Sequence, residues 1–144
     1  MARDINGIIY PVNMNNFKLL LKRKKPMYVK FLIHKKSKNP TRLLKGDTLF
    51  LYLSHKDKSI IGYSKIQNIS FLTPIEIQNN YIGRIQMEPQ EYTVYIKGRL
   101  DKPLISLELS KIVELKTPII IDYPITMAGK YVYGNTINNL IQKI

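Results

Sequence analysis

The stretch that decides the fold is KGDTLFLYLSHKDKSIIGYSKI, residues 45–66, because it has the pattern of two strands joined by a charged turn. Leucines alternate with other residues over Thr48–Ser54, which predicts a strand with one leucine-rich face. Ser59–Ile69 is the expected return strand of this hairpin. Gly62 within the return strand predicts a bulge or a close approach of another part of the backbone.

The residues before the hairpin predict a strand, a helix and a second strand. Ile5–Val12 is the expected first strand, and Asn13 is the expected N-cap of the helix that follows. Met27–His34 then alternates between an apolar face and a less apolar face that carries Tyr28 and Lys30. This alternation predicts a half-buried strand.

The residues after the hairpin predict several short elements. Thr73 begins a capping box, and Pro89 stands at the start of a second short helix. Leu104–Leu109 and Thr117–Asp122 are the remaining expected strands, and Asn135 is the expected N-cap of a C-terminal helix. Short strands with frequent turns predict an α+β fold, a small mixed β pseudo-barrel with peripheral short helices.

Composition limits the class of protein. A chain of 144 residues with 44% apolar and 23% charged residues is expected to form one domain over residues 1–144. Cysteine is absent, which excludes disulfides and cysteine-ligated metals. The first residues lack the apolar core of a signal peptide, and the longest apolar runs are too short to cross a bilayer. We therefore expect a cytoplasmic protein without a membrane partner.

Charge is unevenly distributed along the chain. There are 23 Lys and Arg against 10 Asp and Glu, a net charge of +13, and eleven of the basic residues lie between Asp4 and Asp47, where no acidic residue occurs. A field of one sign is typical of a surface that meets a polyanion, and nucleic acid is the expected partner. The nucleic-acid-binding candidates are Lys22, Arg23, Lys24, Lys25, Lys30, Lys35, Lys36, Lys38, Arg42 and Lys45.

Two other interpretations of this charge stay open. Basic residues at the end of a helix are favoured by the helix dipole even where nothing binds them. The basic face would also suit an acidic protein, in which case the chain is a protein-interaction module. The sequence does not indicate an oligomeric state.

Tyrosine supplies most of the aromatic side chains, with ten tyrosines and no tryptophan. Stacking of a nucleobase on an aromatic ring is worth about 1–3 kcal/mol and needs no particular base. Tyr28, Tyr52 and Tyr63 lie on expected strands beside the basic stretch, so they are the base-stacking candidates. The alternative is that they form the wall of the barrel, with their hydroxyl groups toward water.

Two segments together resemble a known family. Gly46 and Asp47 enter the first strand of the hairpin, and Ile-Gly-x-x-x-Ile follows over Ile61–Ile66, which resembles the core hairpin of PUA-like domains. That superfamily includes the PUA, ASCH, EVE and YTH domains. The tail segment Thr126–Val132, TMAGKYV, together with this hairpin resembles an uncharacterised archaeal family of the superfamily, domain of unknown function 365. The resemblance covers most of the chain.

The resemblance implies a pseudo-barrel of strands with helices at its rim. It also implies RNA as the partner in preference to DNA, because PUA-like relatives bind RNA or hold a modified base in a pocket. The tail segment contains Met127–Gly129, a run of small and flexible residues that predicts a turn where a ligand or the C-terminal helix approaches closely.

Catalysis is an alternative that the sequence supports less well. Some ASCH domains are ribonucleases with a Gly-x-Lys-x-x-Glu-x-Arg motif, and no stretch of this chain reproduces it. No catalytic residue is therefore predicted, although a nuclease or a nucleotide-acting enzyme of ASCH type stays open. His34 and His55 have no metal-ligating partners at suitable spacing, so neither a metal site nor a cofactor is expected.

Overall fold

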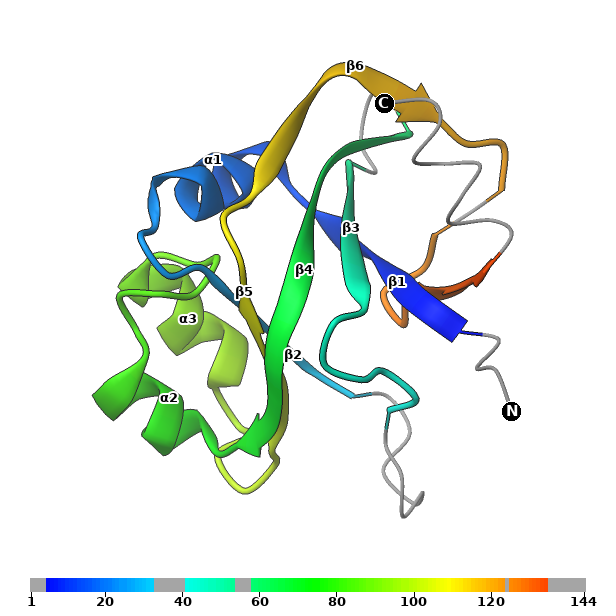
Figure 1. Cartoon of the computed structure of the whole chain (residues 1–144). Helices are drawn as coiled ribbons and strands as arrows, with labels where there is room; N and C mark the ends of the chain where they lie inside the picture. The colour runs from blue at the N-terminus through cyan, green and yellow to red at the C-terminus, as the bar shows by residue number, and fades with distance from the viewer. Residues whose placement is uncertain (1–4, 33–40, 54–57, 124, 135–144) are drawn as a thin grey trace.

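A mixed sheet of seven strands forms the centre of the structure, a computed structural model that describes residues 5–32, 41–53, 58–123 and 125–134 (Figure 1). The strands are β1 (Ile5–Val12), β2 (Met27–Phe31), β3 (Thr48–Leu53), β4 (Ser59–Leu72), β5 (Leu104–Leu109), β6 (Val113–Ile120) and β7 (Lys130–Tyr133). The helices are α1 (Met14–Lys22), α2 (Pro74–Asn80) and α3 (Pro89–Ile96). The expected α+β fold is confirmed.

The sheet follows the order β2-β5-β4-β3-β1-β7, with β6 paired to β4 off this path, and it is not closed. Strand β4 connects its two parts, because residues up to Lys65 pair with β3 and residues from Ile66 onward pair with β5. A Cβ on Gly62 would lie 2.6 Å from the Phe17 ring and 2.9 Å from the Val113 carbonyl oxygen. The close approach that this glycine predicted is therefore present.

The helix starts follow local signals. The Asn13 side chain accepts a hydrogen bond from the Asn16 backbone N–H at 2.8 Å and caps α1, as expected. Thr73 and Glu76 form both bonds of a capping box at the start of α2. None of the helices in the described ranges has the length and apolar character needed to cross a lipid bilayer.

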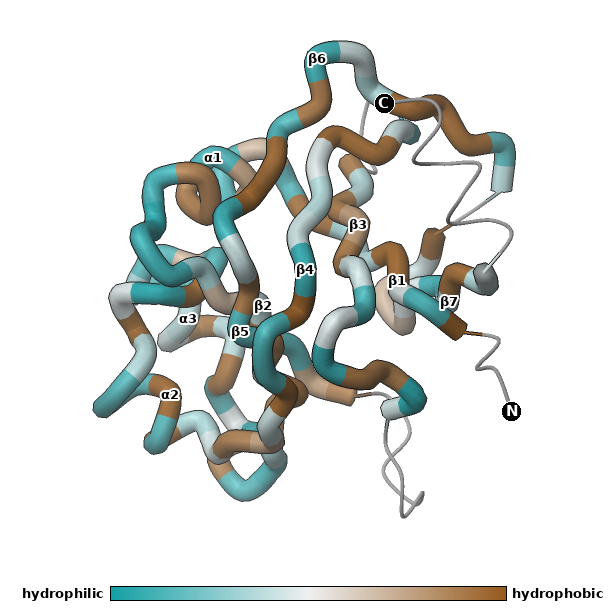
Figure 2. Tube along the Cα trace, in the orientation of Figure 1, coloured by the Kyte–Doolittle hydropathy of each residue, from teal (hydrophilic) through white to brown (hydrophobic). Residues whose placement is uncertain are grey.

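Strands β2 and β3 are buried on both faces, so the prediction that Met27–His34 forms a half-buried strand was wrong. The leucines of β3 pack in one core cluster, and Phe50 and Tyr52 pack in another on the opposite face. Helices α2 and α3 cover the Met27 face of β2, where Ile77 and Tyr92 pack. Figure 2 shows the apolar residues running along the strands in the middle of the molecule. Alternation identified the two faces correctly, but it does not tell what covers them.

The C-terminal third differs from expectation in two places. Strand β6 begins at Val113 and takes in part of the expected Thr117–Asp122 strand, and it pairs with β4. Strand β7 was not predicted, and it pairs with β1 in antiparallel fashion. The helix expected after Asn135 lies outside the described residues.

Candidate functional site

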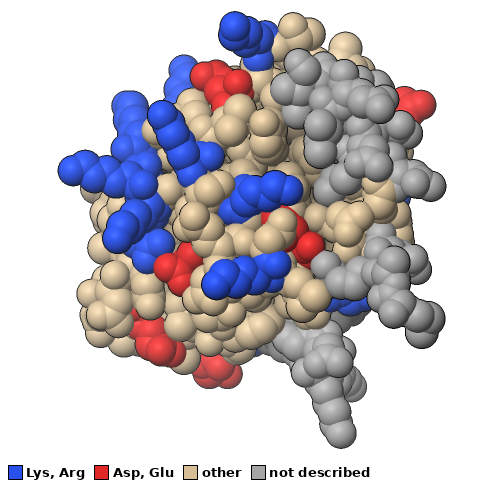
Figure 3. Space-filling model, in the orientation of Figure 1, with Lys and Arg blue, Asp and Glu red and all other residues tan. Residues whose placement is uncertain are grey.

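Basic residues gather at the end of α1 and in the turn that leads to β2. Lys22, Arg23, Lys24 and Lys25 line a shallow hollow of about 420 Å³ together with Gly83 and Arg84. Lys and Arg side chains crowd this side of the molecule, at the left of Figure 3. We call these four residues and Arg84 the α1 basic cluster.

Backbone contacts hold the cluster in place. Arg84 Nε donates to the Lys25 carbonyl oxygen at 2.8 Å, and Arg23 Nε donates to the Ile85 carbonyl oxygen at 3.2 Å. Arg84 also pairs with Glu108 at 3.0 Å. The hydrogen bond from Asn68 and the neighbouring Arg84 lower the pKa of the Glu108 carboxyl group. Lys22, Lys24 and Lys25 remain exposed and available to phosphates.

The other basic candidates do not join this cluster. Arg42 and Lys45 are exposed residues of the segment that leads into β3, which Figure 1 shows apart from the end of α1. The Arg42 backbone N–H donates to the Tyr131 hydroxyl at 3.0 Å. Lys35, Lys36 and Lys38 lie outside the described residues.

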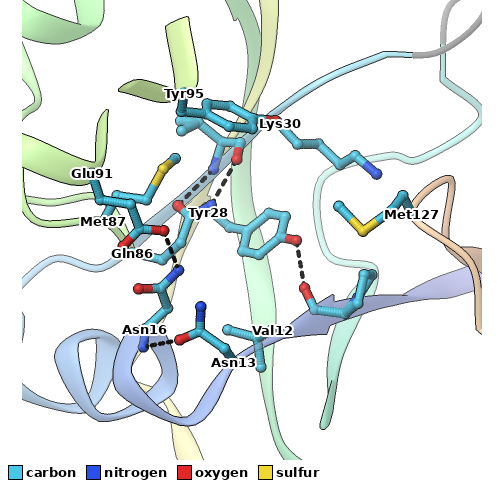
Figure 4. Close-up of a pocket in the computed structure, with 12 residues that line it drawn as sticks. Val12, Asn13, Asn16, Tyr28, Lys30, Gln86, Met87, Glu91, Tyr95 and Met127 are labelled. Atoms are coloured by element: carbon cyan, nitrogen blue, oxygen red, sulfur yellow. Dashed lines mark hydrogen bonds between the residues drawn. The ribbon is translucent and has the colours of Figure 1, made fainter. Parts of the chain in front are cut away.

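A cleft with two adjoining halves lies where β2, α3 and the turn before β7 meet, and Figure 4 shows the half that also borders the start of α1. Lys30, Tyr95 and Met127 line both halves. The amide half has a volume of about 310 Å³, and its other polar side chains are Asn13, Asn16, Gln86 and Glu91. The basic half has a volume of about 410 Å³, and its other charged side chains are Arg99 and Lys102.

Lys30 lies at the junction of the two halves. The residue is 6% exposed, and its Nζ has no hydrogen-bond partner among the residues that the structure describes. The amine lies 4.5 Å from the centroid of the Tyr10 ring, and Figure 4 shows the side chain extending toward Met127. Burial lowers the pKa of the Lys30 amine to about 8, because the charged form loses its hydration. Lys30, one of the predicted nucleic-acid-binding residues, is thus a desolvated cation in a cleft and not part of the exposed surface.

Strand β2 is the end strand of the sheet, so one of its edges has no neighbouring strand in the described part of the chain. Side chains from the cleft wall beside Lys30 form hydrogen bonds with the backbone at this edge. Gln86 accepts from the Val29 N–H at 3.0 Å through Oε1 and donates to the Val29 carbonyl oxygen at 2.7 Å through Nε2. The Tyr95 hydroxyl accepts from the Phe31 N–H at 3.0 Å. These side chains take the place of a neighbouring strand, so the Val29 and Phe31 backbone groups that they contact are hydrogen-bonded.

The turn before β7 brings Met127 to the cleft. Gly129 has a φ of +78°, and a Cβ there would lie 2.4 Å from the Tyr10 ring and 2.8 Å from the Ile9 carbonyl oxygen. Only glycine fits this contact, so the turn rests directly on Tyr10. Met127 is 65% exposed and stands over both halves of the cleft.

Comparison with known sequences decides the family. The family described as a domain of unknown function, DUF365, matches residues 5–134. The chain belongs to this family. The DUF365 prediction from the hairpin and tail segment is therefore confirmed. Among curated proteins, none matches the sequence.

This member of DUF365 shares its fold with solved ASCH structures. A variant of the ASCH protein from Zymomonas mobilis superposes with a TM-score of 0.77 at 14% identity, over 99% of both chains. Another structure of ASCH from Zymomonas mobilis gives 0.76 at 13% identity, over 95% of this chain and 94% of that one. The expected PUA-like fold is thus confirmed.

Of the three base-stacking candidates in this DUF365 chain, one lines the cleft. Tyr28 donates to the Pro11 carbonyl oxygen at 2.8 Å and stacks on Tyr10 with 5.3 Å between ring centroids. Burial raises the pKa of the Tyr28 hydroxyl well above its usual value. Tyr28 is 5% exposed and Tyr52 is 4% exposed, and both belong to core clusters, so neither presents an open ring face as a stacking residue would. Tyr63 packs against Phe50 and does not line the cleft.

Among the cleft residues of the DUF365 chain, Gln86 and Tyr95 were not identified from the sequence, and Arg99 could not be placed on the same face as the other cations. Each lies far in sequence from the β2 residues that it contacts, so no local pattern connects them. Gly98 has a φ of +77° and follows the end of α3. A glycine at this position is a local sequence signal for a helix end, and it places Arg99 just beyond the helix.

Proposed function

We propose that this protein binds nucleic acid, RNA in preference to DNA, and that the cleft around Lys30 takes an unpaired nucleotide. The observation that carries this proposal is the buried Lys30 amine without a partner among the described residues. A desolvated cation costs stability unless an anion compensates it, and such perturbed groups cluster at functional sites. A phosphate group of the ligand would supply that compensation.

The aromatic lining supports a nucleotide rather than a small inorganic anion. Tyr28 and Tyr95 border the amide half, and the exposed thioether of Met127 stands over it. Unpaired bases bind by stacking on partly exposed rings, as that of Tyr95 is, and by hydrogen bonds to their edges. The PUA-like fold supports RNA, because relatives of the superfamily bind RNA or a modified base.

The α1 basic cluster supports contact with a longer strand. Its exposed lysines would neutralise phosphates flanking the bound nucleotide, and each neutralised phosphate releases counterions. Affinity should therefore fall steeply with salt. In a plot of the logarithm of the binding constant against the logarithm of the salt concentration, each phosphate contact on a single strand contributes about −0.7 to the slope.

Binding of fluorescent ten-nucleotide RNA and DNA strands, single and double, at several salt concentrations tests this proposal. We expect single-stranded RNA to bind most tightly, with a slope that becomes flatter when Lys22, Arg23, Lys24 and Lys25 are changed to Ala. Lys111→Ala, an exposed lysine outside the cluster, serves as the control. Absence of binding at low salt, or an affinity independent of salt, would refute the proposal.

A nuclease is the second candidate, and one observation favours it. Glu91 and Lys30 both line the amide half, so a carboxylate and an amine with a lowered pKa share one cleft. Incubating labelled RNA with the protein, with and without a divalent metal ion, decides this question. Cleavage that disappears in Glu91→Gln would support an enzyme, and intact RNA under all conditions would exclude it.

A further inference from the structure

The two halves of the cleft share Lys30 but otherwise differ in charge. Among the described residues, the basic half is lined by three cations and by no Asp or Glu. The amide half contains the carboxylate of Glu91 and the side-chain amides of Asn13 and Asn16. An elongated ligand with a strongly negative end and a neutral polar end would match this arrangement in one orientation only.

Arg99 presents its guanidinium group to the basic half in a fixed position. The guanidinium carbon lies 4.1 Å from the Phe31 ring centroid and 4.9 Å from the Tyr95 ring centroid. One terminal nitrogen donates to the Tyr95 carbonyl oxygen. Guanidinium has five N–H donors, and among the described residues no acidic group pairs with Arg99, so donors remain for a ligand. Phosphate oxygens are suited to this fork of donors.

The amide half offers both donors and acceptors. The Asn16 amide donates to Glu91 Oε2 at 3.0 Å, and the Asn13 oxygen accepts from the Asn16 backbone N–H at 2.8 Å. Within the described part of the chain, the Asn13 amino group and the Asn16 oxygen therefore keep free bonding capacity. The polar edge of a nucleobase carries donors and acceptors that can pair with such groups.

We propose that the basic half binds the terminal phosphate of a nucleic-acid strand, with the base of that terminal nucleotide in the amide half. This inference rests on the proposed function and narrows it from any unpaired nucleotide to a strand end. A terminal phosphate carries close to two negative charges and three acceptor oxygens, whereas an internal phosphodiester carries one charge. Lys30, Arg99 and Lys102 together match the larger charge, and the volume of each half suits a small-molecule group.

The experiment compares three six-nucleotide RNA strands of one sequence, with a 5′-phosphate, a 3′-phosphate or two hydroxyl ends. We expect one of the phosphorylated strands to bind about tenfold or more tightly than the hydroxyl strand, the effect of a lost charge-assisted contact. The preferred strand shows which end the cleft takes. The preference should disappear in Lys102→Ala and in Arg99→Gln. Lys97→Ala, an exposed neighbour that lines neither half of the cleft, should retain it.

The outcomes separate this inference from the proposed function. Equal affinity for all three strands, or a preference that survives in both Lys102→Ala and Arg99→Gln, would overturn the terminal-phosphate site while leaving RNA binding intact. Failure of every strand to bind would overturn both. Because Arg99 packs on two rings, thermal unfolding of Arg99→Gln is measured alongside, and Lys102→Ala decides the matter if that variant does not fold.

Discussion

Lys30 is the residue whose position needs a functional explanation. A lysine on a half-buried strand would extend its amine to water, but here both faces of β2 are covered. The neighbouring Tyr10 ring gives the amine a cation–π contact at 4.5 Å, which compensates only part of the lost hydration. The protein thus keeps a destabilising group in a cleft, as functional sites commonly do.

Replacing Lys30 by Met should stabilise the protein. Met keeps a similar shape and removes the desolvated amine, so we expect the free energy of unfolding to rise by about 2 kcal/mol at pH 7. Urea unfolding of both proteins measures the difference. A loss of stability in Lys30→Met would show that the amine has a structural partner.

Stability of the native chain should also depend on pH through this amine. The pKa of the Lys30 amine is about 8 in the folded protein against an ordinary value of 10.5, so between these values the unfolded chain binds more protons. The free energy of unfolding should therefore rise from about pH 8 to about pH 9. Burial raises the pKa values of Tyr10, Tyr28 and Tyr95, so their ionisation in the unfolded chain opposes the rise as the pH approaches about 10. An equal rise in Lys30→Met would assign the effect to other groups.

Gly129, in the turn before β7, should tolerate substitution poorly. Gly129→Ala places a methyl group against Tyr10 and Ile9 at a φ of +78°, so we expect a loss of about 2 kcal/mol or more. Gly83→Ala is the matched control, because nothing lies within 4 Å of its Cβ position. Thermal unfolding compares the two variants. Equal melting temperatures would mean that the turn does not rest on Tyr10.

At the scale of elements, sequence reasoning succeeded where the signal is local. Asn13 and the Thr73 capping box fixed the starts of α1 and α2, because capping bonds span only three residues. Strand β7 was missed because it exists through pairing with β1, more than a hundred residues away in sequence. Burial of β2 was missed for the same reason, since the side chains that cover it come from α2 and α3.

The hydrogen bonds between Gln86 and the edge of β2 can be tested by mutation. Gln86→Leu removes both bonds to Val29 and leaves its N–H and carbonyl groups buried and unsatisfied, so we expect a loss of about 2–4 kcal/mol. Gln90→Leu, an exposed position on α3, is the control and should change stability by less than about 0.5 kcal/mol. Denaturant unfolding measures both. Similar values for the two variants would contradict the edge-covering role of Gln86.

At the scale of the whole molecule, the described basic residues between Asp4 and Asp47 do not form a single surface patch. The α1 basic cluster lies at the end of α1, and Arg42 and Lys45 lie before β3, apart from it (Figure 1). Between them in sequence, Lys30 enters the cleft, where Arg99 and Lys102 join it from beyond α3. Net charge indicated a class of partner, but only the fold shows which cations share a surface.

The affinity of Lys30→Met for single-stranded RNA tests the central claim most directly. Measured at one low salt concentration beside the native protein, it should be at least about tenfold weaker, because a buried charge-assisted contact is lost. Lys116→Met, an exposed lysine of β6, controls for the loss of one positive charge and should bind nearly as the native protein does. RNA binding by Lys30→Met that equals that of the Lys116 control would contradict the account.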